Sequence, residues 1–332
     1  MGVGRPVGIV GTGLCVPERV LTNHDLEKMV ETSDEWIVTR TGIRERRIAD
    51  RDTASSDLAY GAAVQALRNA GVTPEEVDLI IVATVTPDML FPATACIVQG
   101  RLGATSAAAF DLSAGCSGFP YALATGANFV ATGQYDTVLV IGADCLSKIT
   151  NWKDRATCVL FGDGAGAAVL RQVPQGYGIL GTVLGADGTG GDKLNIAVGG
   201  SRRPLQYEKE ETDDGGRYIR MLGADVFKFA VRIMPAAAEE VMTKAGISPD
   251  EVQLFVPHQA NIRIISAAAD RLGISMDRVF VNVDRYGNTS AASIGIALHE
   301  AVSQGRITRD GIVVFVGFGA GLTWSALAMR WY

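Results

Sequence analysis

The sequence lacks the features of a membrane-spanning or secreted protein. Its 332 residues contain no apolar run of about 18 residues, the length that a transmembrane helix requires. The N-terminal residues pass directly into a strand-like pattern rather than into the charged and apolar regions of a signal peptide. Five cysteines without CxxC spacing or a matching histidine cluster indicate neither a disulfide framework nor a zinc site. We therefore expect a cytoplasmic protein that does not bind a membrane.

Aromatic residues and positive charge are also scarce. Aromatics make up 7% of the chain beside 39 glycines, which favours helices and strands packed closely through small side chains. The net charge of −6 argues against nucleic acid as a partner. No P-loop, HExxH or GxSxG motif is present, so phosphoryl transfer, zinc proteolysis and serine hydrolysis lose their usual signals. The string FGDGAG at residues 161–166 precedes a strand-like stretch instead of a helix and does not predict dinucleotide binding.

A cysteine stands at the centre of the most distinctive stretch, DLSAGCSGFPYALATGANFVATG at residues 111–133. Cys116 lies between a strand-like pattern and an almost uniformly apolar pattern typical of a helix buried on all sides. Backbone N–H groups and the dipole at a helix start favour a thiolate, so we expect a lowered pKa and a nucleophilic role for Cys116. The alternative is a small buried residue, since free cysteine is among the most buried residue types.

The chain contains an internal duplication. AGVTPEEVDL at residues 70–79 recurs as AGISPDEVQL at residues 245–254, and both segments precede apolar strand patterns. At nearly the same spacing, Cys116 falls opposite Asn288.

Each half of this duplication alternates strand and helix patterns. We therefore expect two mostly parallel α/β halves, residues 1–178 and residues 179–332. Because the apolar helices cannot face water, the halves should pack with those helices between two sheets.

The duplication also brings three polar residues together. Cys116 and Asn288 begin equivalent helices, and His258 ends the strand pattern LFVPHQAN, where ligands of open α/β sheets bind. His24 and His299 instead lie in patterns typical of surface residues. Asn288 could alternatively serve only as a cap for the helix that follows it.

With these residues assembled, the chain resembles the thiolase superfamily and, more narrowly, the β-ketoacyl-acyl carrier protein synthase III family. The likeness runs nearly end to end and rests on LSAGCSGF, VPHQANIRI, GNTSAAS, SDEWIVTRTGIRERR, LFGDGAG and GFGAGLTW. A single histidine motif paired with asparagine separates the chain from the elongating synthases, which use two histidines. The region GFGAG lacks the second catalytic cysteine of degradative thiolases. The resemblance implies a thiolase-like fold in which duplicated α/β halves form a five-layered αβαβα sandwich.

The resemblance also implies a two-step reaction that starts fatty acid biosynthesis. Cys116 would take a short acyl group from acyl-coenzyme A, and His258 with Asn288 would then hydrogen-bond the malonyl thioester of malonyl-acyl carrier protein while carbon dioxide leaves. The resulting enolate would attack the acyl-cysteine, whose oxyanion the backbone N–H groups of Cys116 and Ala320 would hold. The family usually has glycine where this chain has Ala320. No metal or redox cofactor is implied, because the chemistry is nucleophilic displacement followed by carbon–carbon bond formation, and acyl-coenzyme A is a substrate.

Further positions match the family's binding residues. The expected coenzyme A contacts are Trp36, Arg40, Arg155, Phe227 and Asn261. Arg263 would meet the acidic carrier protein, and Phe91 would enter the acyl pocket of a second subunit, which implies a homodimer. Ala224 stands where an asparagine is expected beside the pantetheine tunnel, so that contact is not expected. The basic stretch at residues 32–48 could alternatively be a solvated helix end with Trp36 tucked beneath it.

Two other functions stay open from the sequence. Cys, His and Asn are also the set of a papain-like cysteine hydrolase, although the duplication counts against that function. A related condensing enzyme of secondary metabolism would carry the same three residues on the same fold.

We predict that Cys116 is the only cysteine that an acyl donor modifies. Incubation with radiolabelled acetyl-coenzyme A, followed by peptide mapping, should label the peptide that contains Cys116. Label on Cys15, Cys96, Cys145 or Cys158 instead would refute the assignment.

Overall fold

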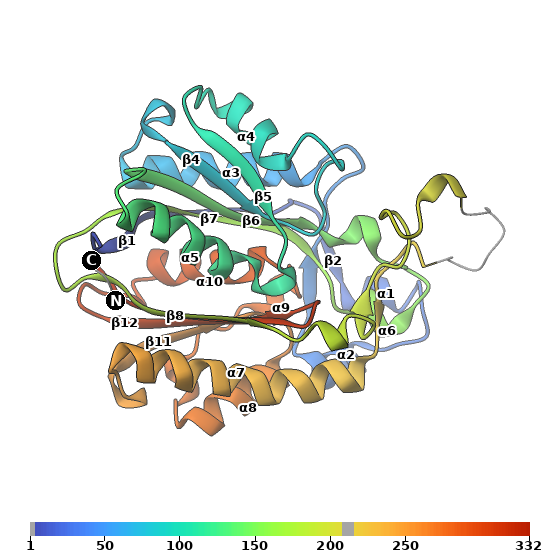
Figure 1. Ribbon diagram of the computed structural model, residues 1–332. Coiled ribbons are helices and arrows are strands. Elements are labelled where there is room, and N and C mark those ends of the chain that lie inside the picture. The colour runs from blue at the N-terminus through green and yellow to red at the C-terminus, as the bar shows by residue number, and fades with distance from the viewer. Residues whose placement is uncertain (1–3, 208–215) are drawn as a thin grey trace.

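Helices and sheets alternate in five layers through the computed structural model, which describes residues 4–207 and 216–332 (Figure 1). Two helices cover the outer face of a five-stranded sheet, two lie between this sheet and a four-stranded one, and two cover the far face of the second sheet. In that order the helices are α3 (Ser55–Ala70), α4 (Thr94–Leu102), α5 (Gly118–Ala131), α10 (Ala292–Ser303), α7 (Gly223–Ala245) and α8 (Ile262–Leu272). The expected αβαβα sandwich is confirmed.

The expectation of mostly parallel halves is wrong, because antiparallel pairs occur in both sheets and the first sheet is only partly parallel. Its strands β5, β4 and β6 run in the same direction, whereas β7 is antiparallel to both of its neighbours, β6 and β1. The string FGDGAG leads into β7, as its pattern predicts, and opens no helix. In sheet order the strands are β1 (Val7–Cys15), β7 (Asp163–Gln172), β6 (Thr137–Cys145), β4 (Leu79–Ala83) and β5 (Ala108–Leu112).

The second sheet repeats the strand order of the first. Its strands are β8 (Gly178–Ala186), β13 (Thr323–Arg330), β12 (Ile312–Gly319) and β11 (Val252–Pro257), of which β11 and β12 are parallel while the pairs of β13 are antiparallel. Where β5 pairs with β4 in the first sheet, the second has only an isolated parallel bridge between Phe255 and Val279. The expected boundary after residue 178 falls at the first residue of β8. The division into two separate units stays a prediction.

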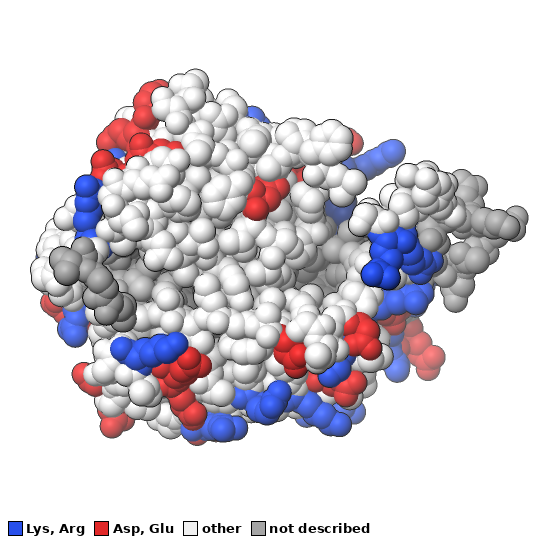
Figure 2. Space-filling model, viewed as in Figure 1, with Lys and Arg blue, Asp and Glu red and all other residues white. Residues whose placement is uncertain are grey.

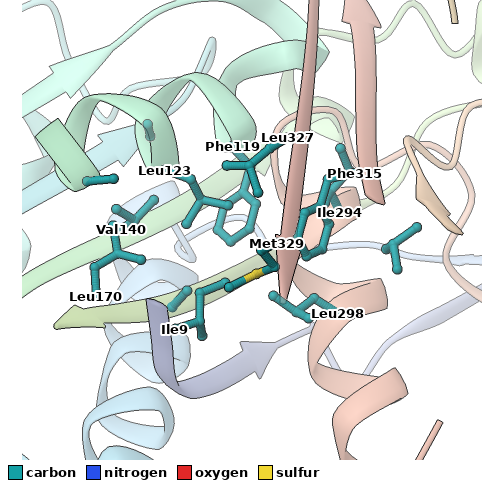
Figure 3. Packing of buried hydrophobic residues seen from close by; sticks show 14 of the residues in the cluster. Ile9, Phe119, Leu123, Val140, Leu170, Ile294, Leu298, Phe315, Leu327 and Met329 are labelled. Carbon is teal, nitrogen blue, oxygen red and sulfur yellow. The ribbon is translucent and has the colours of Figure 1, made fainter. Parts of the chain in front are cut away.

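The largest apolar core fills the space between the sheets (Figure 3). Phe119 and Leu123 project from α5, and Ile294 and Leu298 from α10, toward side chains of both sheets. Because both helices have a sheet on each side, most of their residues are buried. The local sequence pattern predicted His299 at the surface, and this prediction is wrong. His299 is buried in α10, with its Nδ1 3.0 Å from Thr12 Oγ1.

Short elements gather at the rim that holds α2, α6 and β2 (Figure 1). Arg46 is fully buried there and donates to Leu21 O, to Asn23 Oδ1 and to Val159 O, which ties three segments together. The elements are β2 (Val20–Thr22), α1 (Asn23–Leu26), α2 (Asp34–Thr41), β3 (Glu45–Arg47), α6 (Arg155–Cys158), β9 (Leu194–Asn195), β10 (Arg220–Met221) and α9 (Val283–Tyr286). Within the described ranges, no helix combines the length and apolarity needed to cross a membrane.

A glycine contact between β7 and α10 generates a stability prediction. A Cβ on Gly166 would overlap backbone atoms of Gly295, so Gly166→Ala should lower the free energy of unfolding by about 1–3 kcal/mol through overpacking. Urea denaturation would measure the change.

Gly100→Ala is the matched control, because a Cβ on Gly100 in α4 meets no atom within 4 Å. It should raise stability by up to about 1 kcal/mol, the difference in helix propensity. Equal effects of the two substitutions would contradict the packing argument.

Candidate active site

Cys116 lies in the turn between β5 and α5. A short 3-10 turn, Gly115–Ser117, follows the strand, and α5 begins at Gly118. Gly115 has a φ of 57°, and a Cβ there would lie 2.9 Å from Ala320 N. Glycine therefore allows the turn to pass against the end of β12.

The backbone at the end of β12 packs directly on the nucleophile candidate. A Cβ on Gly319 would overlap the backbone N of Cys116, so the two segments touch only because residue 319 has no side chain. Ala320 follows and lines the same cavity as Cys116. Cys116 and Ala320, which are distant in the sequence, thus lie together at one cavity, and the oxyanion hole expected from their backbone N–H groups remains a proposal.

His258 follows β11 and is held on three sides. Its backbone N donates to Val316 O at 2.8 Å, its Nδ1 lies 2.6 Å from Ser293 Oγ, and its ring packs edge-on against Phe318. Burial lowers the pKa of His258 to about 3. The imidazole is therefore neutral near pH 7, with Nε2 left for a ligand.

The side chain of Asn288 is oriented by its own segment. Its Oδ1 accepts the backbone N–H of Ser290 at 2.8 Å, and its backbone pairs with Leu160 and Gly162. The amide oxygen is thus occupied, and the NH2 group is the part that remains to donate to a ligand. Asn288 does not cap α10, whose N-cap position is Ala291.

Two cavities meet at Cys116. One, of about 220 Å³, is mostly apolar; its lining includes Cys116, Val85, Leu146, Ile149, Phe161, Ile219, Ser290 and Ala320. The other, of about 100 Å³, is lined by Cys116, His258 and Asn288 together with residues of α7 and α8. The structure thus brings the three expected catalytic residues together. Most of the apolar lining was missed from the sequence, because it comes from connections without a periodic pattern. Among its apolar residues, Phe161 and Ala320 lay in recognised motifs.

The electrostatics of Cys116 differ from the sequence expectation. Burial raises the pKa of the thiol to about 12, the Ser290 hydroxyl lowers it, and the nearby charge of Asp144 raises it further. The sequence argument considered only the helix start, whereas solvent exclusion and a buried carboxylate act in the opposite direction. At rest the site therefore holds a neutral thiol beside a neutral imidazole.

Trp36 and Arg155 come together from distant parts of the chain. The Arg155 guanidinium lies 5.0 Å from the centre of the Trp36 ring, and Arg155 also donates to Glu31 O. Trp36 is 36% exposed, so it is not tucked beneath the basic stretch. Such a pair of an aromatic face and a cation suits a nucleotide.

The other expected binding residues lie in or next to the lining of the smaller cavity. Asn261 and Phe227 line it, and the Arg263 guanidinium lies 5.2 Å from the Phe227 ring centre. Asn261 uses its amide within the protein, because it donates to Arg40 O and accepts the N–H of Arg263 at the start of α8. Coenzyme A contacts of Asn261 and Arg40 therefore stay predictions.

Phe91 lies outside both cavities of its own chain. It follows β4 in a loop before α4 and is 84% exposed. A role within this chain's own acyl cavity is not indicated, and its role toward a second subunit stays a prediction.

Comparisons with known proteins now decide the family. Models described as 3-oxoacyl-[acyl-carrier-protein (ACP)] synthase III and as the C terminal of the same synthase match residues 110–188 and 242–331. A β-ketoacyl-[acyl-carrier-protein] synthase III of Caldanaerobacter subterraneus subsp. tengcongensis is 59% identical over 98% of this chain and 97% of its own length. This chain belongs to the 3-oxoacyl-[acyl-carrier-protein] synthase III family.

Solved structures agree with this membership. The synthase III of Thermus thermophilus is 53% identical, with a TM-score of 0.91 over 98% of this chain and 99% of its own. The priming β-ketosynthase of the R1128 polyketide pathway has the same TM-score at 38% identity and covers 100% of this chain and 98% of its own. The chain is thus a condensing acyltransferase, and these similarities do not favour the cysteine hydrolase.

Burial of His258 leads to a prediction about its titration. Because burial lowers its pKa to about 3, the ring should stay neutral, and its NMR signals should not move between pH 5 and 8. Ring ¹⁵N spectra, with His258→Gln to assign the signal, would test this. A titration midpoint inside that interval would show that the site is more open to water than the structure indicates.

Proposed function

We propose that this chain condenses a short acyl-coenzyme A with malonyl-acyl carrier protein, and so starts fatty acid biosynthesis. The products are 3-oxoacyl-acyl carrier protein, carbon dioxide and coenzyme A. The observation that carries the proposal is the position of Cys116, where an apolar cavity meets a cavity that contains His258 and Asn288. An acyl group on the sulfur would have an apolar space on one side and hydrogen-bond donors on the other.

The first half-reaction is acyl transfer to Cys116. The sulfur attacks the thioester carbonyl, and the backbone N–H groups of Cys116 and Ala320 hold the oxyanion. Coenzyme A then leaves, and the acyl chain occupies the apolar cavity. The modest volume of about 220 Å³ supports a short chain.

The second half-reaction places negative charge on the malonyl thioester oxygen as carbon dioxide leaves. Neutral His258 can donate from Nε2, and the oriented Asn288 amide can donate from its NH2 group. The enolate carbon then attacks the acyl carbonyl, a carbon–carbon bond forms, and the Cys116 sulfur leaves. Both donors are fixed before the charge develops, which is how such sites stabilise it.

The substrates would approach along the rim where α2, α7 and α8 meet. Trp36 and Arg155 would hold the adenine of coenzyme A, with Arg40, Phe227 and Asn261 along its arm. Arg263 is exposed beside Phe227 and would attract the acidic carrier protein.

A homodimer is part of the proposal. Strand β5 is an edge of its sheet, and the middle of the face formed by β5, α5 and β8 shows few charged residues (Figure 2). Leu90 and Phe91 are more than four-fifths exposed in the loop before α4. An unpaired strand edge and exposed apolar side chains support an interface at which Phe91 enters the acyl cavity of the partner.

The two half-reactions should separate in single variants. His258→Ala and Asn288→Ala should still form acyl-enzyme but nearly lose decarboxylation, because one missing oxyanion donor typically costs on the order of 10² to 10³ in rate. Cys116→Ala should form no acyl-enzyme but still release carbon dioxide from malonyl-acyl carrier protein. Mass spectrometry of the protein and a carbon dioxide assay measure the two steps.

An inverted result would support a hydrolase instead. If His258→Ala abolished acylation while decarboxylation survived, His258 would act as the base for Cys116. Coenzyme A release without consumption of malonyl-acyl carrier protein would also support a hydrolase.

A further inference from the structure

Ser290 connects two buried groups that the proposed mechanism leaves unlinked. Its hydroxyl lies close enough to the Cys116 thiol and to the Asp144 carboxyl to lower the pKa of each, and the backbone N of the next residue, Ala291, donates to Asp144 Oδ2 at 3.1 Å. Ser290 is 2% exposed and lines the apolar cavity beside Cys116. Ser290 also has a φ of 51°, a conformation that residues other than glycine adopt rarely, and its N–H donates to Asn288 Oδ1. The fold holds this hydroxyl in place at the cost of backbone strain.

Asp144 is a fully buried carboxylate at the end of β6. Its Oδ1 accepts from the Thr84 and Thr86 hydroxyls and from Val85 N, and its Oδ2 accepts from Ala291 N. Among the described residues, no ion pair involves Asp144, so its hydrogen-bond donors are neutral. Burial raises the pKa of this carboxyl, which increases its affinity for a proton.

The buried thiol needs a proton acceptor before it can attack. Transfer to His258 would create a thiolate and an imidazolium, two new charges in a site that excludes water. Nδ1 of His258 contacts a serine hydroxyl, not a carboxylate that would stabilise the imidazolium. Transfer to Asp144 only moves one existing negative charge from oxygen to sulfur.

We propose that Asp144 accepts the Cys116 proton through the Ser290 hydroxyl during acylation. The S–H proton passes to Ser290 Oγ as the Ser290 proton passes to Asp144, and the sulfur keeps the electron pair with which it attacks the thioester. Coenzyme A leaves as a thiolate that takes a proton from water. When condensation later releases the Cys116 thiolate, the proton on Asp144 returns along the same path and restores the thiol.

This inference rests on the proposed function, and two buried serines allow a matched test of it. Ser290 contacts Cys116 and Asp144, whereas Ser293, three residues later and equally buried, contacts His258. Ser290→Ala should slow self-acylation from acetyl-coenzyme A at pH 7 by on the order of 10²-fold, as loss of a proton-transfer group typically does. Ser293→Ala should act mainly on decarboxylation.

The pH profile separates proton transfer from a structural role. The described titratable groups around this path are Cys116, Asp144 and His258, with Cys145 beside Asp144. The relay requires Asp144 to be ionised before acylation, so wild-type acylation should be nearly independent of pH between 7 and 9. In Ser290→Ala and Asp144→Asn, solvent must take the proton from a thiol with a pKa of about 12, so the rate should rise about tenfold per pH unit.

Each outcome decides one question. A Ser290→Ala profile parallel to that of the wild type, or an unchanged rate, overturns the relay. A wild-type protein that forms no acyl-Cys116 overturns the proposed function itself. Thermal unfolding of each variant identifies loss of folding, and if Asp144→Asn fails to fold, Ser290→Ala, which keeps the carboxylate, still gives the answer.

Discussion

The site depends on close backbone contact between the central helices and the two sheets. A Cβ on Gly142 or Gly166 would overlap backbone of α10 or of the turn before it, and a Cβ on Gly319 would overlap Cys116. These glycines allow both helix starts to reach the same rim, because no side chain separates the two backbones at these contacts. Cys116 and Asn288, 172 residues apart in the chain, can therefore line one cavity.

The same close packing sets the chemistry of the site. Excluding water raises the pKa of Cys116 and lowers that of His258, so neither group is charged at rest. A neutral imidazole suits the donation of a hydrogen bond to an enolate, but a neutral thiol is a poor nucleophile. Burial thus favours one half-reaction and hinders the other, and the hindered one is the step that a proton acceptor at Asp144 would assist.

The internal duplication carried the correct predictions of the layered fold and of the three residues that meet at the site. The repeated AGVTPEEVDL and AGISPDEVQL segments fixed the register of the two halves, and from that register followed the layers and the meeting of Cys116, His258 and Asn288. The pKa of Cys116 was predicted in the wrong direction, because it depends on solvent exclusion and on Asp144 in another strand. His299 was placed at the surface because its local pattern does not reveal that a sheet covers each side of α10. The apolar cavity could not be predicted, since connections such as the one after β6 supply it.

Duplication explains why a nearly symmetric fold holds an asymmetric site. In the first sheet, β4 ends at Ala83, and the next residue, Thr84, donates to the buried Asp144. In the second sheet the equivalent strand β11 ends at Pro257, and the next residue is His258. Two equivalent strand ends thus hold different groups, a threonine that binds the buried carboxylate of the neighbouring strand β6 and an imidazole that can donate a hydrogen bond. Both halves contribute to the two cavities that meet at Cys116, and the asymmetry of the site arises from the different residues at their equivalent strand ends.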